Sequence, residues 1–552
     1  MGHNSRGELQ RIAEETFGWV QLRPEQLEAM EQVVAGHDVL AVLPTGAGKS
    51  AIYQVPALGL DGPTLVVSPL IALQNDQIEG IEDSAAPEAV ALNSAQSSAE
   101  RTHAWRVLRQ ESAEYLFVSP EQLADDELVE ELAGLGVALF VVDEAHCVSS
   151  WGHDFRPDYL RLSPVIERLG HPRVIALTAT AALPVRRDIV ERLGLRDHRE
   201  VIGGFDRPNL RLTVERFTDD AAKRSGLVTV VEVLTRDPAT RRGLVYTATR
   251  KDTDLYAAEL ERTGLRVAAY HAGMKAADRE RVHERFLADD LDVVVATSAF
   301  GMGIDKPDVR FVVHASVPES LDTYYQQIGR AGRDGEPAEI VLLYREQDLG
   351  LQKFLTAGRA PADTLEEVAR ALDEHDEPVA LSELKREVDS APARTTRAVN
   401  LLEEAEAVTA DDAGRLEYRD DDLPPEDAVA AAVELAEANQ RLTRSRIEMM
   451  RGYAETAGCR RQYLLGYLGE QLERPCGNCD TCTAGTAEAR SGGSDRFPTG
   501  SHVQHTEFGE GVVMSGDDER VTVLFDDVGY RTLSLEAVER NDLLTPSGPA
   551  RP

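Results

Sequence analysis

The segment that decides the fold runs from Asp38 to Ser50, with the sequence DVLAVLPTGAGKS. After Asp38, the five residues Val39–Leu43 form an apolar run with the length of a buried strand, and PTGAGKS then leads into a helix. Backbone N–H groups in such a glycine-rich turn cradle phosphate, which favours a nucleotide-binding loop over a turn with a chance lysine. We expect Lys49 to reach the β- and γ-phosphates and Ser50 to ligate Mg²⁺. The predicted phosphate-binding residues are Thr45, Gly46, Ala47, Gly48, Lys49 and Ser50.

Apolar runs with helical stretches between them continue outward from this segment. Further strands are predicted at 64–68, 115–119, 138–142 and 174–177, and a second series at 243–247, 267–270, 293–297, 311–314 and 339–344. Alternation of strand and helix indicates parallel sheets. We therefore predict an α/β fold with two tandem α/β domains, 1–204 and 205–358.

The composition changes after residue 358. Residues 359–425 suggest a winged-helix-like segment, in which two helices precede two short strands around 411–414. Residues 426–490 are mostly helical and include a cysteine cluster, and 491–501 form a linker rich in Gly, Ser and Pro. Residues 502–552 alternate apolar and polar side chains with glycine at turns, which predicts a small β-barrel.

The net charge is −37, because 96 acidic residues outnumber 59 basic ones. A polyanion attracts basic surfaces, so composition alone favours a protein partner, and any nucleic-acid groove must be local and salt-sensitive. No run of about 18 apolar residues is present, and the first residues lack the apolar core of a signal peptide. We expect a cytoplasmic protein with no membrane span.

Four of the five cysteines have the spacing Cys459-x16-Cys476-x2-Cys479-x2-Cys482. Four thiolates suit a closed tetrahedral zinc site with a structural role, an interpretation favoured over four free thiols. Cys147 stands alone and is interpreted as a small buried hydrophobe. Arg460 and Arg461 follow the first ligand; we expect solvated charges there rather than contacts to phosphate.

Two adjacent carboxylates, Asp143 and Glu144, follow the predicted strand at 138–142. Such a pair is also common as solvated charge, but downstream of PTGAGKS it fits Mg²⁺ coordination by Asp143 and activation of the attacking water by Glu144. Upstream, the amide of Gln26 is suited to the adenine edge, and Trp19 and Arg23 to its two faces. An amphipathic helix with a core tryptophan explains that region equally well.

The run Asp143–Tyr159, DEAHCVSSWGHDFRPDY, resembles the RecQ family of DNA helicases. The resemblance implies two RecA-like domains that clamp ATP, 3′→5′ translocation on single-stranded DNA, and a role in repair or recombination. It implies that Trp151, Phe155 and Arg156 contact DNA, which suits aromatic and guanidinium groups that stack on bases. Further motifs in family order are VVSPL (66–70), with Gln74 and Gln77 after it, and TAT (178–180), whose hydroxyls are placed to bridge Glu144 and His146.

The second α/β domain carries YTATR (246–250), ATSAFGMGIDKP (296–307) and YYQQIGRAGRDG (324–335). Arg330 and Arg333 are three residues apart on one predicted helix face, so both suit arginine fingers, with Arg333 the first choice. Asp305 is expected to contact the nucleotide, and Gln327 stands where the family usually has Glu. The expected catalytic residues are Lys49, Asp143, Glu144, His146, Arg330 and Arg333.

Two features depart from the better-known RecQ layout. The winged-helix-like segment precedes the cysteines instead of following them, so docking against the helicase core is favoured over a DNA-reading wing. The C-terminal pattern HVxxTxFGxGVV (502–513) resembles the small Tudor-like barrel of UvrD/PcrA-type helicases, which implies a protein-interaction module, with an inert barrel as the alternative. A monomer is expected; an RNA helicase and a catalytically silent scaffold are the alternative functions.

Overall fold

A computed structural model describes most of the chain and divides it into two compact units. The first unit holds residues 1–43, 48–203 and 358–440, and the second holds 44–47, 204–357 and 441–552. The described residues are 2–69, 71–93, 96–110, 112–149, 156–300, 306–350, 352, 362–375, 377–410, 415–419, 423–487, 496–516, 519–526 and 528–547.

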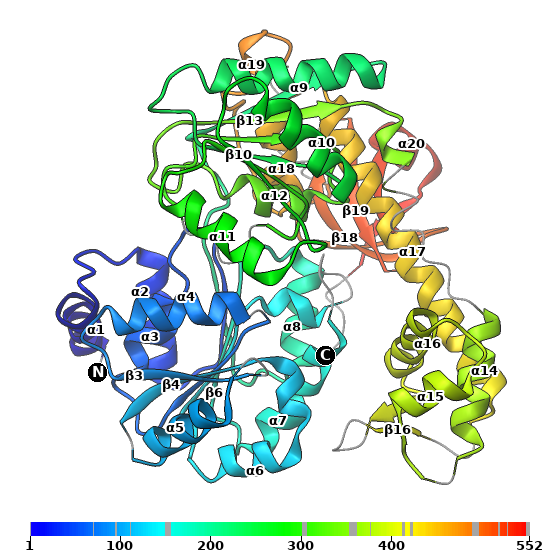
Figure 1. Ribbon diagram of the computed structural model, residues 1–552. Coiled ribbons are helices and arrows are strands. Elements are labelled where there is room, and N and C mark those ends of the chain that lie inside the picture. The colour runs from blue at the N-terminus through cyan, green and yellow to red at the C-terminus, as the bar shows by residue number, and fades with distance from the viewer. Residues whose placement is uncertain are drawn as a thin grey trace. The chain divides into compact units, whose positions relative to one another are not determined.

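The first unit contains a parallel seven-stranded sheet in the order β3-β4-β2-β5-β6-β1-β7, covered by helices (Figure 1). The four residues of β1 are buried and apolar, which fits its interior place between β6 and the edge strand β7. Because β5, β6 and β1 are neighbours, the loops after these three strands meet at one sheet edge. The strands are β1 (Val39–Val42), β2 (Thr64–Val67), β3 (Glu88–Leu92), β4 (Ala113–Val118), β5 (Leu139–Val142), β6 (Arg173–Thr178) and β7 (Arg199–Ile202).

The helices of this sheet are α1 (Gly2–Phe17), α2 (Pro24–Ala35), α3 (Ala51–Ala57), α4 (Ile71–Glu82), α5 (Ser98–Arg109), α6 (Asp126–Ala133), α7 (Leu162–Arg168) and α8 (Leu183–Arg192). Three 3-10 turns accompany them: η1 (Pro120–Ala124), η2 (Ala145–Val148) and η3 (Pro157–Arg161). None of the helices among the described residues has the length and apolarity needed to cross a membrane.

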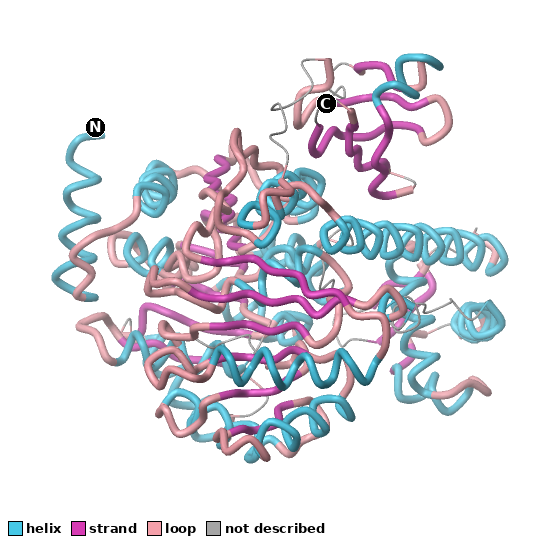
Figure 2. The backbone as a smooth tube through the Cα atoms, turned by 90° about the horizontal axis from the view of Figure 1, so that it is seen from above, coloured by secondary structure: helices cyan, strands magenta, loops and turns pink. Residues whose placement is uncertain are grey.

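The second unit contains a parallel six-stranded sheet in the order β10-β11-β9-β12-β13-β8. Figure 2 distinguishes the strands of the chain, in magenta, from its helices, in cyan. The strands are β8 (Leu210–Arg216), β9 (Gly243–Tyr246), β10 (Val267–Tyr270), β11 (Val293–Ala296), β12 (Phe311–His314) and β13 (Ala338–Tyr344). Its helices are α9 (Asp220–Leu234), α10 (Arg250–Glu261), α11 (Ala276–Leu287) and α12 (Leu321–Ile328). The prediction of two parallel α/β sheets is confirmed.

The predicted winged-helix-like segment has three helices and a three-stranded sheet in the order β14-β16-β15. It packs around its own core, which includes Leu365, Leu384 and Leu402. Within the first unit, Arg161 Nη2 lies 3.1 Å from Glu403 Oε1, so this segment contacts the flank of the seven-stranded sheet at η3. Its elements are α14 (Ala362–Asp373), β14 (Val379–Ala380), α15 (Leu381–Glu387), α16 (Pro392–Glu404), β15 (Val408–Ala410) and β16 (Arg415–Tyr418).

The long helix α17 (Pro425–Glu455) continues from this segment into the second unit, where α18 (Arg460–Tyr467) and the short α19 (Asp480–Thr483) complete the cysteine module. The C-terminal sheet that follows is antiparallel, in the order β20-β19-β18-β17-β21, around buried Val503, Val523 and Phe525. Its elements are β17 (His502–His505), β18 (Gly509–Gly516), β19 (Arg520–Phe525), β20 (Gly529–Ser534), α20 (Leu535–Asn541) and β21 (Leu544–Pro546). The prediction was a small β-barrel; the structure has a small antiparallel sheet in which β20 and β21 do not pair with each other among the described residues, and α20 is an addition to it.

Candidate active site and metal centre

The loop after β1 has the backbone conformation that its glycines permit. Gly46 and Gly48 have φ values of 80° and 69°, a region that favours glycine. A Cβ on Gly48 would also lie 2.7 Å from Gln26 Nε2, so a side chain there would displace Gln26. Lys49 Nζ lies 3.5 Å from the Leu43 carbonyl oxygen. The loop therefore keeps its N–H groups and Lys49 together in a tight turn.

Gln26 is held by backbone groups on both sides. Its Oε1 accepts a hydrogen bond from Arg23 N at 2.7 Å, and its Nε2 donates to the Gly48 carbonyl at 2.8 Å. Trp19 stacks on Phe17 with 4.6 Å between ring centroids and packs against a small core under α1 and α2. Gln26 thus connects the segment with Trp19 and Arg23 to the phosphate loop, while Trp19 is part of the local packing.

The two carboxylates after β5 are partly buried and lie in a strongly charged environment. Burial and the neighbouring Glu144 raise the pKa of Asp143, and the Lys49 ammonium partly opposes this rise. Glu144 has a φ of 48°, which turns the chain directly after the strand. Close like charges in a buried place favour a bound cation, and carboxylate oxygens suit Mg²⁺.

His146 connects the ends of β5 and β6. Its Nδ1 lies 3.3 Å from Glu144 Oε2 and 3.0 Å from Thr178 Oγ1, and its side chain is buried. The Tyr159 hydroxyl donates to the Asp143 carbonyl oxygen at 3.0 Å. The structure therefore brings together Glu144, His146 and Thr178, as expected from the order of the motifs.

The predicted DNA-contacting residues are only partly described. Trp151 and Phe155, together with the predicted nucleotide ligand Asp305, lie outside the described residues. Arg156 Nη1 donates to the Pro69 carbonyl at 3.2 Å, which connects it to the loop after β2. Gln74 in the same region is fully buried and donates to the Ser68 carbonyl at 3.0 Å, so it shapes that loop instead of reaching nucleic acid.

In the second unit, α12 leads directly into the segment with Arg330 and Arg333. Arg330 is buried, and its guanidinium lies close enough to Tyr246, at the end of β9, to oppose the rise that burial causes in the pKa of Tyr246. Arg207 donates to three carbonyls of the segment, those of Gly329, Ala331 and Gly332, at 3.3, 2.8 and 2.9 Å. Sequence analysis missed Arg207; the run Asp206–Asn209 (DRPN), just before β8, was the available signal.

The cysteine cluster fits a zinc ion. The four Sγ atoms of Cys459, Cys476, Cys479 and Cys482 all lie within 4.8 Å of one another. Cys476 N donates to Cys459 Sγ at 3.3 Å, and Asn478 N donates to Cys476 Sγ at 3.4 Å. Four soft donors that converge without an oxygen ligand suit structural Zn²⁺.

The expectation of solvated or phosphate-binding arginines beside Cys459 is wrong. Arg460 and Arg461 are only 3% and 6% exposed. Arg460 pairs with Asp480 at 2.6 Å, and Arg461 donates to the Leu210 carbonyl at 2.5 Å. Arg461 therefore holds the cysteine module against β8 and its preceding loop, whereas Arg460 braces the module internally through Asp480, whose carboxylate also accepts a hydrogen bond from Val214 N of β8. Cys147 is buried, as expected.

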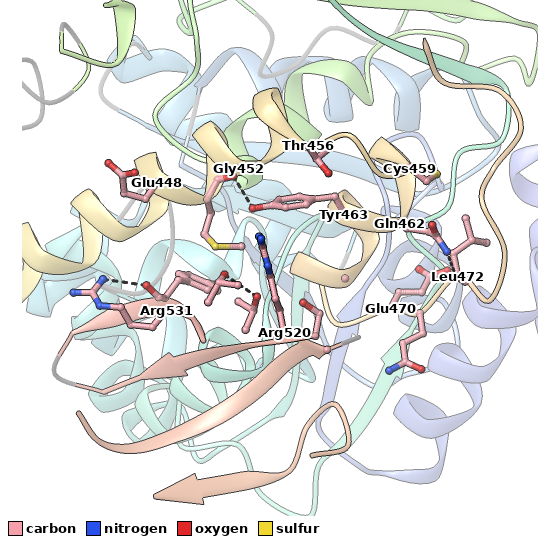
Figure 3. Close-up of a pocket in the computed structure, with 18 of the residues that line it drawn as sticks. Glu448, Gly452, Thr456, Cys459, Gln462, Tyr463, Glu470, Leu472, Arg520 and Arg531 are labelled. Atoms are coloured by element: carbon pink, nitrogen blue, oxygen red, sulfur yellow. Dashed lines mark hydrogen bonds between the residues drawn. The ribbon is translucent and has the colours of Figure 1, made fainter. Parts of the chain in front are cut away.

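A pocket of about 660 Å³ lies between the cysteine module and the C-terminal sheet (Figure 3). In the figure, the Tyr463 side chain of α18 points toward Gly452 of α17, and a Cβ on Gly452 would be 2.2 Å from the Tyr463 hydroxyl. Beside the pocket, Tyr530 stacks on Tyr467 with 5.0 Å between centroids. The C-terminal sheet is therefore packed on α17 and α18.

Comparisons with known families cover most of these features. A model of DEAD/DEAH box helicases matches residues 23–189, one of the helicase conserved C-terminal domain matches 226–335, and one of RecQ zinc-binding domains matches 412–483. Among solved structures, the DUF1998 helicase MrfA bound to DNA and AMPPNP shows a similar fold, with a TM-score of 0.52, 18% identity and coverage of 77% of this chain and 63% of that chain.

Comparison with curated proteins identifies the family of the chain more narrowly. It is 38% identical to the probable ATP-dependent DNA helicase RecS of Bacillus subtilis, over 67% of this chain and 73% of that protein. It is 41% identical to the ATP-dependent DNA helicase RecQ of the same organism, over 61% and 56%, and 34% identical to RecQ of Haemophilus influenzae, over 85% and 63%. Together with the matched zinc-binding domain, these identities show that the chain belongs to the RecQ family of DEAD/DEAH box DNA helicases.

Proposed function

We propose that this RecQ-family protein hydrolyses ATP to translocate 3′→5′ along single-stranded DNA and to unwind duplexes in repair or recombination. The observation that carries the proposal is the meeting of three motifs at one sheet edge. Lys49 and Asp143 interact electrostatically there, and Glu144 contacts His146, which contacts Thr178. Such an arrangement suits phosphoryl transfer to water.

Within the first unit, the proposed roles follow from chemistry and position. The loop N–H groups and Lys49 bind the phosphates, and Ser50 and Asp143 would hold Mg²⁺, which supplies electrostatic stabilisation of the developing charge. Glu144 takes the proton of the attacking water, while His146 orients the Glu144 carboxylate. Trp19, Arg23 and Gln26 are proposed to bind the base.

The remaining roles complete the cycle. Arg333, with Arg330 beside it, neutralises charge on the transferred phosphoryl group, and Asp305 contributes to the nucleotide site. Trp151, Phe155 and Arg156 are proposed to contact single-stranded DNA. We further propose that the protein acts as a cytoplasmic monomer and that the C-terminal sheet binds a protein partner; the two outer strands of that sheet, β20 and β21, each pair on one side only among the described residues.

The test is ATP hydrolysis with single-stranded DNA, with RNA and without nucleic acid, for the parent and for Glu144→Gln. Strong stimulation by DNA in the parent, lost in the variant, supports the proposal. Displacement from duplexes with a 3′ or a 5′ tail then tests the direction, and only the 3′-tailed substrate should be unwound. Stimulation by RNA alone would assign an RNA helicase, and no hydrolysis with either polymer would leave a scaffold.

A further inference from the structure

Helix α12, which precedes Arg330 and Arg333, is anchored in the cysteine module. The Tyr324 hydroxyl of α12 lies 3.0 Å from the Tyr453 hydroxyl of α17, and both side chains are fully buried. Asp322, also on α12, accepts a hydrogen bond from the Tyr467 hydroxyl of α18. The position of α12 therefore depends on two helices that lie outside its own sheet.

The same module connects these contacts to the cysteine cluster. Arg460 follows Cys459 and Asp480 follows Cys479, and the two side chains form a two-pronged ion pair at 2.6 and 2.9 Å. Arg460 Nη1 also donates to the Tyr453 carbonyl at 2.7 Å, and its guanidinium lies 5.8 Å from the Tyr453 ring centroid. A continuous set of contacts thus runs from two cluster thiols to the partner of Tyr324.

The contacts continue on the other side of α12. The Tyr324 ring lies 4.9 Å from the ring of His314, and His314 stacks on Tyr246 at 5.6 Å. Tyr246 lies close enough to Arg330 for the guanidinium to oppose the rise that burial causes in the pKa of Tyr246. Arg330 is therefore reached from the cluster both along α12 and across the buried rings of β12 and β9.

A bound zinc ion would fix the relative position of Cys459 and Cys479, and so of the residues that follow them. A buried ion pair is favourable only when its geometry is closely held, because desolvation of both charges opposes it. Arg460 and Asp480 thus depend on the cluster for the geometry that keeps Arg460 on Tyr453.

We propose that the zinc cluster positions Arg330 and Arg333 for ATP hydrolysis through Asp480, Arg460, Tyr453 and Tyr324, which are positioning residues rather than catalytic ones. The inference rests on the proposed role of the two arginines. It gives the zinc module a task in the chemical step, in addition to stabilising its own fold.

The kinetic test uses Tyr453→Phe, which removes one hydroxyl. We expect kcat of DNA-stimulated hydrolysis to fall about fivefold, the equivalent of one hydrogen bond. The KM for ATP and the affinity for single-stranded DNA should stay within about twofold of the parent values. Zinc content per chain, measured by atomic emission, should be unchanged.

The matched control is Tyr463→Phe. This tyrosine lies in the same module and donates to the Met449 carbonyl at 3.2 Å, a contact that stays within the module (Figure 3). Its loss should leave kcat within about twofold. In an Arg330→Ala background, Tyr453→Phe should cause little further loss. An equal effect of the two tyrosine variants, or a full additional loss in that background, would overturn the proposal.

A second measurement does not depend on activity. Hydrogen exchange of the full chain is followed with zinc bound, after zinc removal with a chelator, and for zinc-loaded Tyr453→Phe. Exchange over Leu321–Arg333 should rise both in the zinc-free protein and in zinc-loaded Tyr453→Phe. In Tyr453→Phe, residues 459–482 should stay protected. Helix α10 serves as the reference, and its exchange should not change. Unchanged exchange in α12 would refute the positioning link. A parent without ATPase activity whose α12 still responds to zinc would instead refute the proposed function.

Discussion

The nucleotide-binding loop and the cysteine module were both predicted from short sequence motifs, but their charged side chains are arranged differently. Two like charges lie together near the loop, whereas two opposite charges pair in the module. After β5, Asp143 and Glu144 lie side by side, and burial together with the repulsion from Glu144 raises the pKa of Asp143. In the cysteine module, Arg460 and Asp480 neutralise each other within a set of hydrogen bonds. Unbalanced buried charge marks a place prepared for a ligand and for chemistry, whereas balanced buried charge holds elements together.

The largest effect is expected from removing one of the two like charges after β5. Glu144→Gln should lower kcat of ATP hydrolysis by about 10²- to 10⁴-fold, because it removes the proposed general base. The same change removes the charge that raises the pKa of Asp143, so the apparent melting temperature should rise. Steady-state hydrolysis and thermal unfolding without nucleotide measure the two effects. A melting temperature that falls would show that Glu144 stabilises the apo site.

The second-largest effect is expected from removing one charge of the Arg460–Asp480 pair. Asp480→Ala should lower the free energy of unfolding by about 3 kcal/mol, because it leaves the buried Arg460 guanidinium without its carboxylate. Arg451→Ala is the control: its pair with Glu346, at 2.8 Å, is exposed and should contribute less than about 1 kcal/mol. Denaturant unfolding of zinc-loaded protein gives both values. Equal losses would mean that burial does not distinguish the two pairs.

A third prediction introduces charge into a neutral buried site. Burial lowers the pKa of His314 to about 4, although the hydrogen bond to Gln327 opposes the shift. Folded His314 stays neutral while the unfolded chain takes up a proton near pH 6.5, so stability is lost as pH falls from 6.5 toward 4.

Gln327→Glu should raise the pKa of His314, because it places a carboxylate beside the imidazole. At pH 5 the variant should then keep about 2 kcal/mol of stability that the parent loses. Urea unfolding at pH 7 and at pH 5, compared between parent and variant, isolates this contribution. The same acid loss in both proteins would show that the carboxylate at position 327 does not raise the pKa of His314 or that the loss comes from other groups.

The smallest effect concerns a half-exposed pair. Arg161→Ala should destabilise the contact of the winged-helix-like segment by less than about 1 kcal/mol, since solvent screens its bond to Glu403. Hydrogen exchange over α16 should rise slightly, while helices of the seven-stranded sheet stay protected. A loss of stability as large as that of Asp480→Ala would show that this pair contributes as much as the buried Arg460–Asp480 pair.

The sequence predictions were accurate for local motifs and missed features that depend on tertiary contacts. The phosphate loop, the Asp143–His146 run and the four cysteines were predictable, because each is a local pattern with a fixed chemical purpose. Strands β3, β7 and β8 were missed, since Glu88, Arg199 and the charges of β8 suit partly exposed positions away from the sheet centre. The burial of Arg460 and Arg461 was missed because their partners, such as Asp480 and Leu210, are set by tertiary contacts.

The close packing at Gly452 limits how this sequence can vary. A glycine inside a long helix costs about 1 kcal/mol relative to alanine, so helix propensity alone would favour its replacement. Yet even the methyl group of alanine would lie 2.2 Å from the Tyr463 hydroxyl. In a library of all single substitutions, position 452 should accept almost nothing but glycine unless residue 463 becomes smaller at the same time, so the two positions should change together.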